Sequence, residues 1–311
     1  MAVNKNGIVV MGAVFVDIKG FPDDVYIPDG RNAGKVEYIH GGVSRNVVED
    51  IANMELRPTF LSIVDESALG DAVVRKLNNH KVNTEYMQST PNGMGTWLAV
   101  FDNNGDLAGS ISQRPDLMPL LDVLEKKGDE IFANADSIII EVDVDKEIVK
   151  KVVELCEKHQ KKLYGVVSNM SIAVERRDFL QKFDCFICNQ LEAGMFFADD
   201  FSETAPKELA EILAKKLQLA KIPSMVVTMG GAGSVYADMK GKKGFCPAKK
   251  VQVKDTTGAG DAFCAGVSSG LTYGKTLAES VEIGTRLAAS VITSSENVCP
   301  RFLPGELGIE A

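Results

Sequence analysis

Residues 255–261 (Asp-Thr-Thr-Gly-Ala-Gly-Asp) place glycines, hydroxyls and two carboxylates within one short stretch. Gly258 and Gly260 let the backbone turn sharply and approach a ligand closely, because glycine has no Cβ atom. The small and apolar residues from Ala262 onward predict a tightly packed helix. The free N–H groups of its first turn and the positive end of its dipole favour an anion. The stretch therefore predicts a site that handles phosphate.

Asp261 needs a separate explanation, because its carboxylate competes with a phosphate for the same positive field. A useful role is that of a general base, which takes the proton from a hydroxyl that attacks phosphorus. The amides of Gly258, Ala259 and Gly260 would then stabilise the charge that develops. The alternative is a helix cap, a role that many aspartates fill. The motif taken alone leaves both roles open.

Length and composition predict a globular α/β protein, because 311 residues can bury a sizeable core. Hydrophobic residues make up 45% and charged residues 25% of the chain, which is ordinary for a soluble protein. The net charge of -9 argues against a nucleic-acid or membrane surface. No apolar run reaches the length of a membrane span, and residues 1–7 lack an apolar signal core. We therefore expect a cytoplasmic protein.

The six cysteines are too dispersed for a disulfide scaffold. Cys185 and Cys188 have the spacing of metal ligands, but no second pair follows them. The residues between them are typical of a buried strand, on which these two thiols point to opposite faces. We therefore expect no structural metal site there.

Strand-like and helix-like segments alternate along the chain. The strand-like segments are residues 8–14, 59–64, 137–142, 163–167, 185–188, 225–229 and 251–254. The helix-like segments are residues 44–54, 69–80, 146–160, 206–219 and 287–293. This alternation predicts parallel βαβ units and a doubly wound, mostly parallel sheet flanked by helices, as a single domain over residues 1–311.

Two regions, residues 21–40 and 93–112, depart from this pattern. In the second region, residues 96–101 and 107–112 flank Asn103-Asn104-Gly105-Asp106, which is a strong hairpin signal. We expect the two regions to form a small β-sheet that stands off the main domain as a lid. Trp97, the only tryptophan, would pack within that lid.

Polar residues and glycines follow several of these segments. Asp17 comes after the first buried strand, where open α/β sheets bind ligands, although it could also bond its own turn. Gly41 and Gly42 open the helix at 44–54, and Asn46 can donate and accept hydrogen bonds to diol oxygens. Arg45 is either a surface charge or a ligand contact.

Further candidates lie in the C-terminal half. Asn189 and Glu192 directly follow the strand at 185–188. Thr228, Gly230 and Gly233 follow the strand at 225–229. Because residues 234–238 continue as a strand instead of a helix, a dinucleotide-binding turn is excluded there.

Two of these motifs together resemble the ribokinase-like (PfkB) family of carbohydrate and nucleoside kinases. Residues 255–263 resemble its C-terminal signature, and residues 41–46 (Gly-Gly-Val-Ser-Arg-Asn) resemble its N-terminal one. The flanking residues 12–20, 34–36 and 45–49 are similar to bacterial pseudouridine kinases. Many family members carry Asp-Pro where this chain has Ser168-Asn169, and Pro where it has Cys188.

The resemblance implies an ATP-dependent kinase that phosphorylates the 5′-hydroxyl of a ribosyl substrate, with pseudouridine as the first candidate. The alternatives are a kinase of free ribose or of another pentose or hexose, a kinase of another nucleoside, and a sugar- or nucleoside-binding sensor without catalysis. It also implies Mg²⁺, in many relatives a monovalent cation such as K⁺, and a homodimer formed through the lid.

The resemblance also implies a role for each motif residue. Asp261 would be the general base beside an anion hole formed by Gly258, Ala259 and Gly260. The expected substrate-binding residues are Asp17, Gly41, Gly42, Arg45 and Asn46. The expected nucleotide-binding residues are Asn189, Thr228, Gly230, Gly233 and Thr257. The expected metal-site residues are Glu192 and Asp255.

Overall fold

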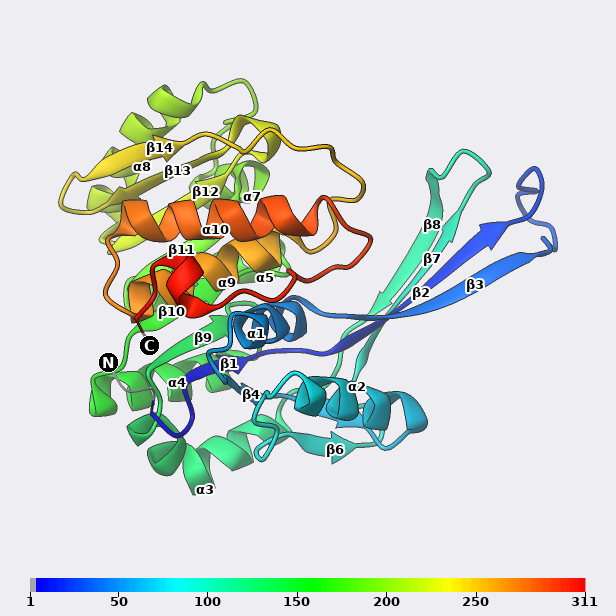
Figure 1. Ribbon diagram of the computed structural model, residues 1–311, viewed down its shortest axis with the longest axis horizontal. Helices are drawn as coiled ribbons and strands as arrows, with labels where there is room; N and C mark the ends of the chain where they lie inside the picture. The colour runs from blue at the N-terminus through cyan, green and yellow to red at the C-terminus, as the bar shows by residue number, and fades with distance from the viewer. Residues whose placement is uncertain (1–3, 311) are drawn as a thin grey trace.

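An eight-stranded sheet forms the centre of the molecule, with the strand order β14-β13-β12-β11-β10-β9-β1-β4 (Figure 1). The computed structural model describes residues 4–310. In this order the strands from β4 to β12 pair in parallel, and β13 pairs antiparallel with both β12 and β14. Their bounds are β1 (Ile8–Met11), β4 (Thr59–Leu61), β9 (Ser137–Glu141), β10 (Leu163–Val166), β11 (Cys185–Asn189), β12 (Ser224–Thr228), β13 (Ser234–Asp238) and β14 (Lys243–Cys246).

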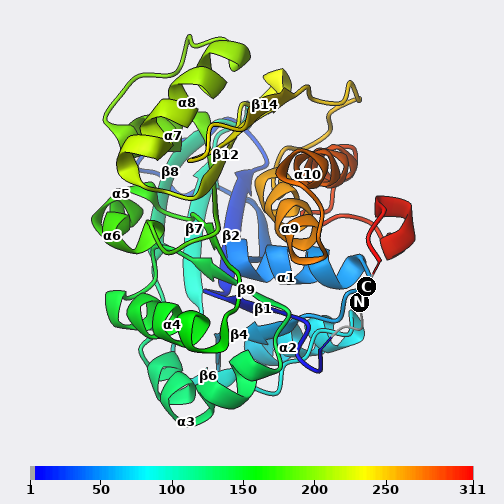
Figure 2. The ribbon, with the colours of Figure 1, turned by 90° about the vertical axis from the view of Figure 1, so that its left-hand side faces the viewer.

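Helices cover both faces of this sheet (Figure 2). One face carries α1 (Val43–Asn53), α2 (Ala68–Asn79), α9 (Ala259–Thr272) and α10 (Leu277–Val291). The other carries α3 (Pro119–Ala133), α4 (Lys146–His159), α5 (Met170–Ala173), α6 (Arg177–Leu180), α7 (Gln190–Phe197) and α8 (Pro206–Ala220).

The first strand shows why the apolar runs are continuous. Val9 and Met11 are fully buried in the core under α3, α4 and α8, whereas Ile8 and Val10 are fully buried in the core under α1 and α9. A strand that is covered on both faces needs apolar residues at every position. The expected doubly wound sheet is therefore confirmed.

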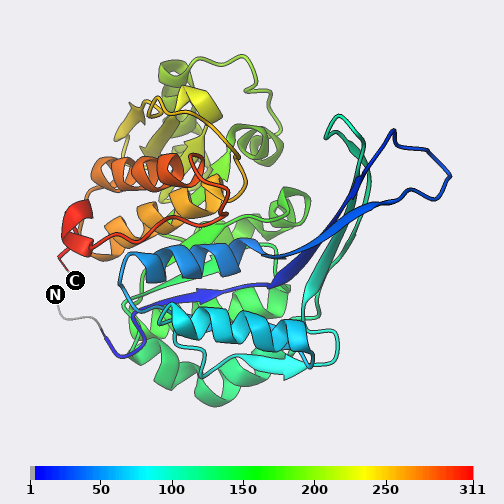
Figure 3. The same ribbon diagram turned by 45° about the vertical axis from the view of Figure 1, so that its right-hand side comes forward.

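A second, four-stranded sheet projects from one end of the body as a lid (Figures 1 and 3). Its strands are β2 (Phe15–Pro22), β3 (Gly34–Gly41), β7 (Gly95–Phe101) and β8 (Leu107–Gln113), in the order β3-β2-β7-β8. The expected hairpin joins β7 to β8, and Gly105 in its turn has a φ of 86°. The lid begins earlier in the chain than expected, so Asp17 lies on a lid strand and not in a loop.

The structure corrects several predicted elements. The predicted strand at 251–254 is a loop, because β14 ends at Cys246, the following Pro247 has no N–H for a ladder, and Lys254 N donates to Ile292 O. The predicted strand at 59–64 divides into β4 and β5 (Ile63–Asp65), and β5 pairs with β6 (Gln88–Thr90) in a separate sheet. Sequence patterns missed α3, β14 and most of α10. Within residues 4–310, every helix falls short of the length and apolar character that a membrane span requires.

Candidate active site

Asp261 lies in the first turn of α9, which begins directly after Gly258. Nδ2 of Asn46, on α1, donates a hydrogen bond to Oδ2 of Asp261 at 2.7 Å. Burial raises the pKa of Asp261 to about 7, against the opposing effects of the Asn46 hydrogen bond and the charge of Arg45. A carboxylate with a pKa near neutrality is suited to exchanging a proton with a bound hydroxyl.

Asp261 and Asn46 line a cavity of about 520 Å³ between the lid and the body. The cavity brings together the substrate-side residues expected from the N-terminal third and the phosphate turn near the C-terminus. Its lining residues are Phe15, Asp17, Gly41, Gly42, Val43, Asn46, Trp97, Ser112, Arg114, Ser168, Asn169, Thr257, Asp261 and Asn297.

Asp17 lies on the inward face of the lid, opposite Ile39 on β3 and Trp97 on β7. Burial raises its pKa, although the positive charges of Lys19 and Arg45 oppose the shift. A Cβ atom at Gly41 would lie 2.7 Å from Oδ1 of Asp17, so only glycine leaves room for this carboxylate. Asp17 is thus an acceptor that the fold holds at the mouth of the cavity.

Asn46 offers a second acceptor. Its Nδ2 is committed to Asp261, but its Oδ1 is buried and has no hydrogen-bond partner among the described residues. An unpaired buried oxygen is costly unless a ligand or water donates to it. A substrate hydroxyl in the cavity would satisfy it.

The glycines before Asp261 have different structural roles. Gly258 has a φ of +80°, and a Cβ atom there would lie 1.9 Å from the carbonyl oxygen of Asn297, so the fold itself requires glycine. A Cβ atom at Gly260 would meet no atom within 4 Å. Gly260 therefore leaves open space at the start of α9, where N–H groups are free to bind an anion.

Arg45 lies outside the cavity. It is buried, and its guanidinium pairs with Glu49 at 2.5 Å and donates to the carbonyl oxygens of His40 and Gly41. The expected role as a substrate contact does not fit this placement. Its contacts instead hold the backbone at Gly41, beside Asp17.

Asn189 and Glu192 form a capping box at the start of α7. Oδ1 of Asn189 accepts from the N–H of Glu192 at 2.9 Å, and Oε2 of Glu192 accepts from the N–H of Asn189 at 2.7 Å. Burial raises the pKa of Glu192, and the charge of Asp143 adds to the shift. Both side chains therefore cap α7, and Oε1 of Glu192 takes no part in these contacts.

Glu192 can supply a carboxylate to a magnesium ion that a nucleotide brings with it. Within residues 4–310, no cluster of three or more His, Cys, Asp or Glu side chains could hold a metal by itself. Mg²⁺ commonly takes one or two carboxylates, keeps several waters and shares phosphate oxygens, so a complete protein cage is unnecessary. Oδ1 of Asp255 accepts from the N–H of Thr257, which lowers the pKa of Asp255.

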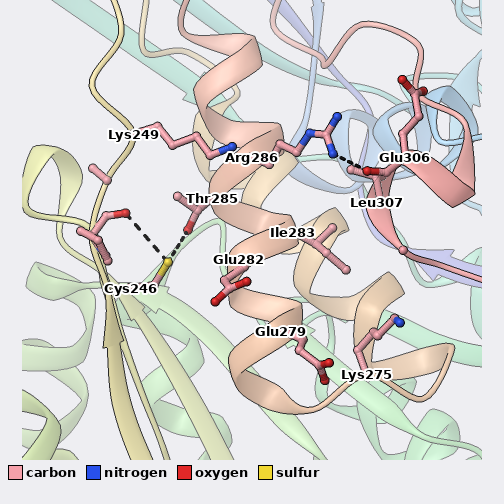
Figure 4. Close-up of a pocket in the computed structure, with 13 residues that line it drawn as sticks. Cys246, Lys249, Lys275, Glu279, Glu282, Ile283, Thr285, Arg286, Glu306 and Leu307 are labelled. Carbon is pink, nitrogen blue, oxygen red and sulfur yellow. Dashed lines mark hydrogen bonds between the residues drawn. The ribbon is translucent and has the colours of Figure 1, made fainter.

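A second cavity, of about 650 Å³, lies beyond the turn after β12 (Figure 4). It is bounded by α10, the segment after β14 and the C-terminal 3₁₀ turn (Pro304–Leu307), and Thr285 points toward Cys246 across it. A Cβ atom at Gly233 would lie 2.2 Å from the carbonyl oxygen of Cys246, which lines this cavity. The turn that holds Thr228, Gly230 and Gly233 therefore adjoins it.

Sequence reasoning missed several residues of the site. Glu141 is the last residue of β9 and Asp143 lies just beyond it, and the rule applied to Asp17 could have found them. Glu141 is buried, accepts from Ala13 N and Ser44 Oγ at 2.8 Å each, and burial raises its pKa to about 7. No sequence signal pointed to Arg114.

The chain was compared with known proteins. The model of the pfkB family of carbohydrate kinases matches residues 5–299. A guanosine-inosine kinase of Exiguobacterium acetylicum is 35% identical over 294 residues, which cover 94% of this chain and 96% of that protein. A pseudouridine kinase of Escherichia coli (strain K12) is 24% identical over 278 residues, which cover 89% and 87% of the two chains.

Solved structures agree on the fold. The structure of Arabidopsis thaliana ribokinase complexed with ribose and ATP superposes with a TM-score of 0.84 at 19% identity, covering 98% of this chain and 99% of that one. With the match over nearly the whole chain, the protein belongs to the pfkB family of carbohydrate kinases and is a phosphotransferase with an alcohol group as acceptor.

Proposed function

We propose that this protein transfers the γ-phosphoryl group of ATP to the 5′-hydroxyl of a ribonucleoside. The observation that supports it most is the position of Asp261, whose carboxylate lines the cavity beside Asp17 and Asn46 and lies within the first turn of α9. The general base, Asp261, thus directly follows the residues whose amides would bind the phosphate.

In the proposed reaction, Asp17 and Asn46 hold the ribose diol, and Asp261 accepts the proton of the 5′-hydroxyl. The hydroxyl oxygen then forms a bond to the γ-phosphorus as the bond to the bridging β–γ oxygen breaks, and ADP leaves with that electron pair. The amides of Gly258, Ala259 and Gly260 stabilise the charge on the transferring group. A magnesium ion, when bound, would neutralise phosphate charge near Glu192.

We place the nucleotide between these amides and the second cavity. Gly233 lies against Cys246, which lines the 650 Å³ cavity, so a nucleotide that passes the turn at Thr228, Gly230 and Gly233 would reach this cavity with its base. Asn189 and Thr257 would contact its phosphates. A monovalent cation near Asp255, suggested by the family resemblance, belongs to the same proposal.

Guanosine and inosine are the first acceptors to test, because the relative with those substrates in its name is 35% identical over nearly the whole chain. Pseudouridine is the second candidate, supported by the 24% relative and by the motif resemblance. The test is an ADP-release assay with ATP and a panel of guanosine, inosine, adenosine, pseudouridine and free ribose. A clear preference for free ribose would refute the nucleoside assignment.

The lid also supports a proposal about assembly. Val36, Tyr38 and Ile111 lie on its outward face and are 57%, 61% and 70% exposed. We propose that two copies pair through this face. The test is the molar mass in solution of the unaltered protein and of the variant Tyr38→Lys. The unaltered protein should have the mass of two chains, and the variant should shift toward the mass of one. A mass of one chain for both proteins would refute the pairing.

A further inference from the structure

The cavity contains an arginine that is fixed in place at the root of the lid, where β8 ends. Arg114 directly follows β8 and is two residues beyond Ser112, so the two share the inward face of the lid. Its Nη2 donates to the carboxylate of Asp143 at 2.9 Å and to the carbonyl oxygen of Asp143 at 3.0 Å. One corner of the guanidinium is therefore occupied.

Asp143 organises this end of the cavity. Its side chain is fully buried, and its Oδ1 accepts from the N–H of Ser168 at 3.0 Å. The same carboxylate thus fixes the guanidinium of Arg114 and the backbone before Asn169, and all three of Arg114, Ser168 and Asn169 line the cavity. Asp143 therefore bonds both to the part of the cavity wall that the lid contributes and to the part that the loop after β10 contributes.

The remaining donors of Arg114 are available to a ligand. Among residues 4–310, every hydrogen bond of Arg114 comes from Nη2, and the side chain is 38% exposed. Asn169 adds another free donor, since its Oδ1 accepts from Ser171 N as a helix cap. A guanidinium has no acceptor atom, so this wall offers mainly donors and suits a ligand edge made of acceptors.

We propose that Arg114 recognises the 6-oxo edge of a purine nucleoside and selects guanosine and inosine over adenosine. This inference depends on the proposed nucleoside kinase activity. With the ribose held at Asp17 and Asn46, Arg114 and Asn169 are among the lining residues left for the base. A 6-oxopurine presents the acceptor O6, which can accept from the N–H bonds of Nη1 that Asp143 leaves free.

Adenosine has the opposite polarity at position 6. Its amino group would direct N–H bonds at the N–H bonds of Arg114, and two donors cannot satisfy each other. The unpaired guanidinium would be the larger penalty, because a site built to hydrogen-bond one substrate group discriminates strongly against an analogue that lacks it. Pseudouridine presents carbonyl oxygens as well, so it is compatible with the same wall.

The test compares inosine, purine riboside and adenosine, which differ at position 6 of the base. For the unaltered protein we expect kcat/KM to fall in the order inosine, purine riboside, adenosine. In Arg114→Met the ratio of inosine to adenosine should fall by about 10-fold to 100-fold, because a hydrogen bond to a charged group is lost for inosine alone. Arg114→Lys keeps the charge but cannot bond Asp143 and the base with separate nitrogens, so it should recover only part of the ratio.

Controls separate base recognition from a structural role. Arg301→Gln removes an arginine that pairs with Glu55 at 2.7 Å on the surface, and it should leave the ratio unchanged. Because Arg114→Met leaves a buried carboxylate without its partner, the double variant Arg114→Met with Asp143→Asn repeats the measurement without that charge.

The outcomes are distinct. Equal losses for inosine and adenosine in both Arg114 variants, or an unaltered protein that prefers adenosine, would overturn the role of Arg114 while leaving a nucleoside kinase in place. A protein that phosphorylates ribose and no nucleoside would overturn the proposed function and this inference together.

Discussion

Nδ2 of Asn46 donates to Oδ2 of Asp261 at 2.7 Å, across 215 positions of the chain. This bond joins α1 to α9, and so joins the segment that holds the expected ribose contacts to the segment that holds the phosphate turn. It also stabilises the ionised form of a carboxylate that burial otherwise keeps protonated.

Replacing Asn46 with Leu should move the pH dependence of the reaction. The hydrogen bond lowers the pKa of Asp261, so its loss should raise that pKa and displace the acid limb of kcat/KM to higher pH. The KM for the acceptor should also rise, because Oδ1 of Asn46 is lost. If the variant and the unaltered protein had identical pH profiles, Asn46 would not influence the pKa of the general base.

The unaltered protein should lose activity as the pH falls through about 7. Asp261 must be ionised to accept a proton, and burial raises its pKa to about 7. We expect kcat/KM to decrease about tenfold per pH unit below that value and to level off above it. The measurement is the pH profile of kcat/KM at saturating ATP.

The same pKa predicts how stability changes with pH. The folded protein binds the proton of Asp261 more tightly than the unfolded chain does, so this residue costs stability as the pH rises from about 4 through 7. Asp261→Asn should therefore melt a few degrees higher than the unaltered protein at pH 8 and at nearly the same temperature at pH 4. An equal difference at both pH values would contradict the raised pKa.

The glycines of the turn should respond differently to alanine. Gly260→Ala meets no neighbouring atom, so the protein should fold with unchanged stability, while the methyl group blocks the approach of phosphate and activity falls by 100-fold or more. Gly258→Ala should also lower the melting temperature, because its φ is +80° and its Cβ would overlap Asn297. Gly109→Ala, at another open position on β8, is the control and should retain activity.

Gly41→Ala should weaken binding of the acceptor but not of ATP. Its Cβ atom would lie 2.7 Å from Oδ1 of Asp17, which must then move away from the diol. We expect KM for the nucleoside to rise at least tenfold and KM for ATP to stay within about twofold. Gly20→Ala, on the same lid sheet with its nearest neighbour at 3.8 Å, serves as the control.

The sequence predicted the elements that are determined by residue type and by neighbours in the sequence. Continuous apolar runs such as 8–14 and the turn at Gly105 identified buried strands and the lid hairpin, because burial on both faces and a positive φ leave few residue choices. The motifs at 41–46 and 255–261 predicted residues that line one cavity. These features depend on residue type and near neighbours alone.

Features set by long-range packing were not predictable in this way. Arg45 lies within the motif at 41–46, four residues before Glu49, and only the packing of α1 against its neighbours decides that this pair is buried. Arg114 and Asp143 are 29 residues apart in unrelated segments, so no spacing rule connects them. The loop at 251–254 has an apolar alternation typical of a strand but lies beyond the last partner strand.

The proposed phosphoryl transfer depends most on Asp261, and the variant Asp261→Asn tests it most directly. Asparagine keeps the shape of the side chain and can accept from Asn46, but it cannot take a proton from a hydroxyl. We predict that phosphoryl transfer to the preferred nucleoside falls by about 10²–10⁴-fold, while the affinity for ATP measured by calorimetry stays unchanged. Turnover at the rate of the unaltered protein would show that this carboxylate is not the base.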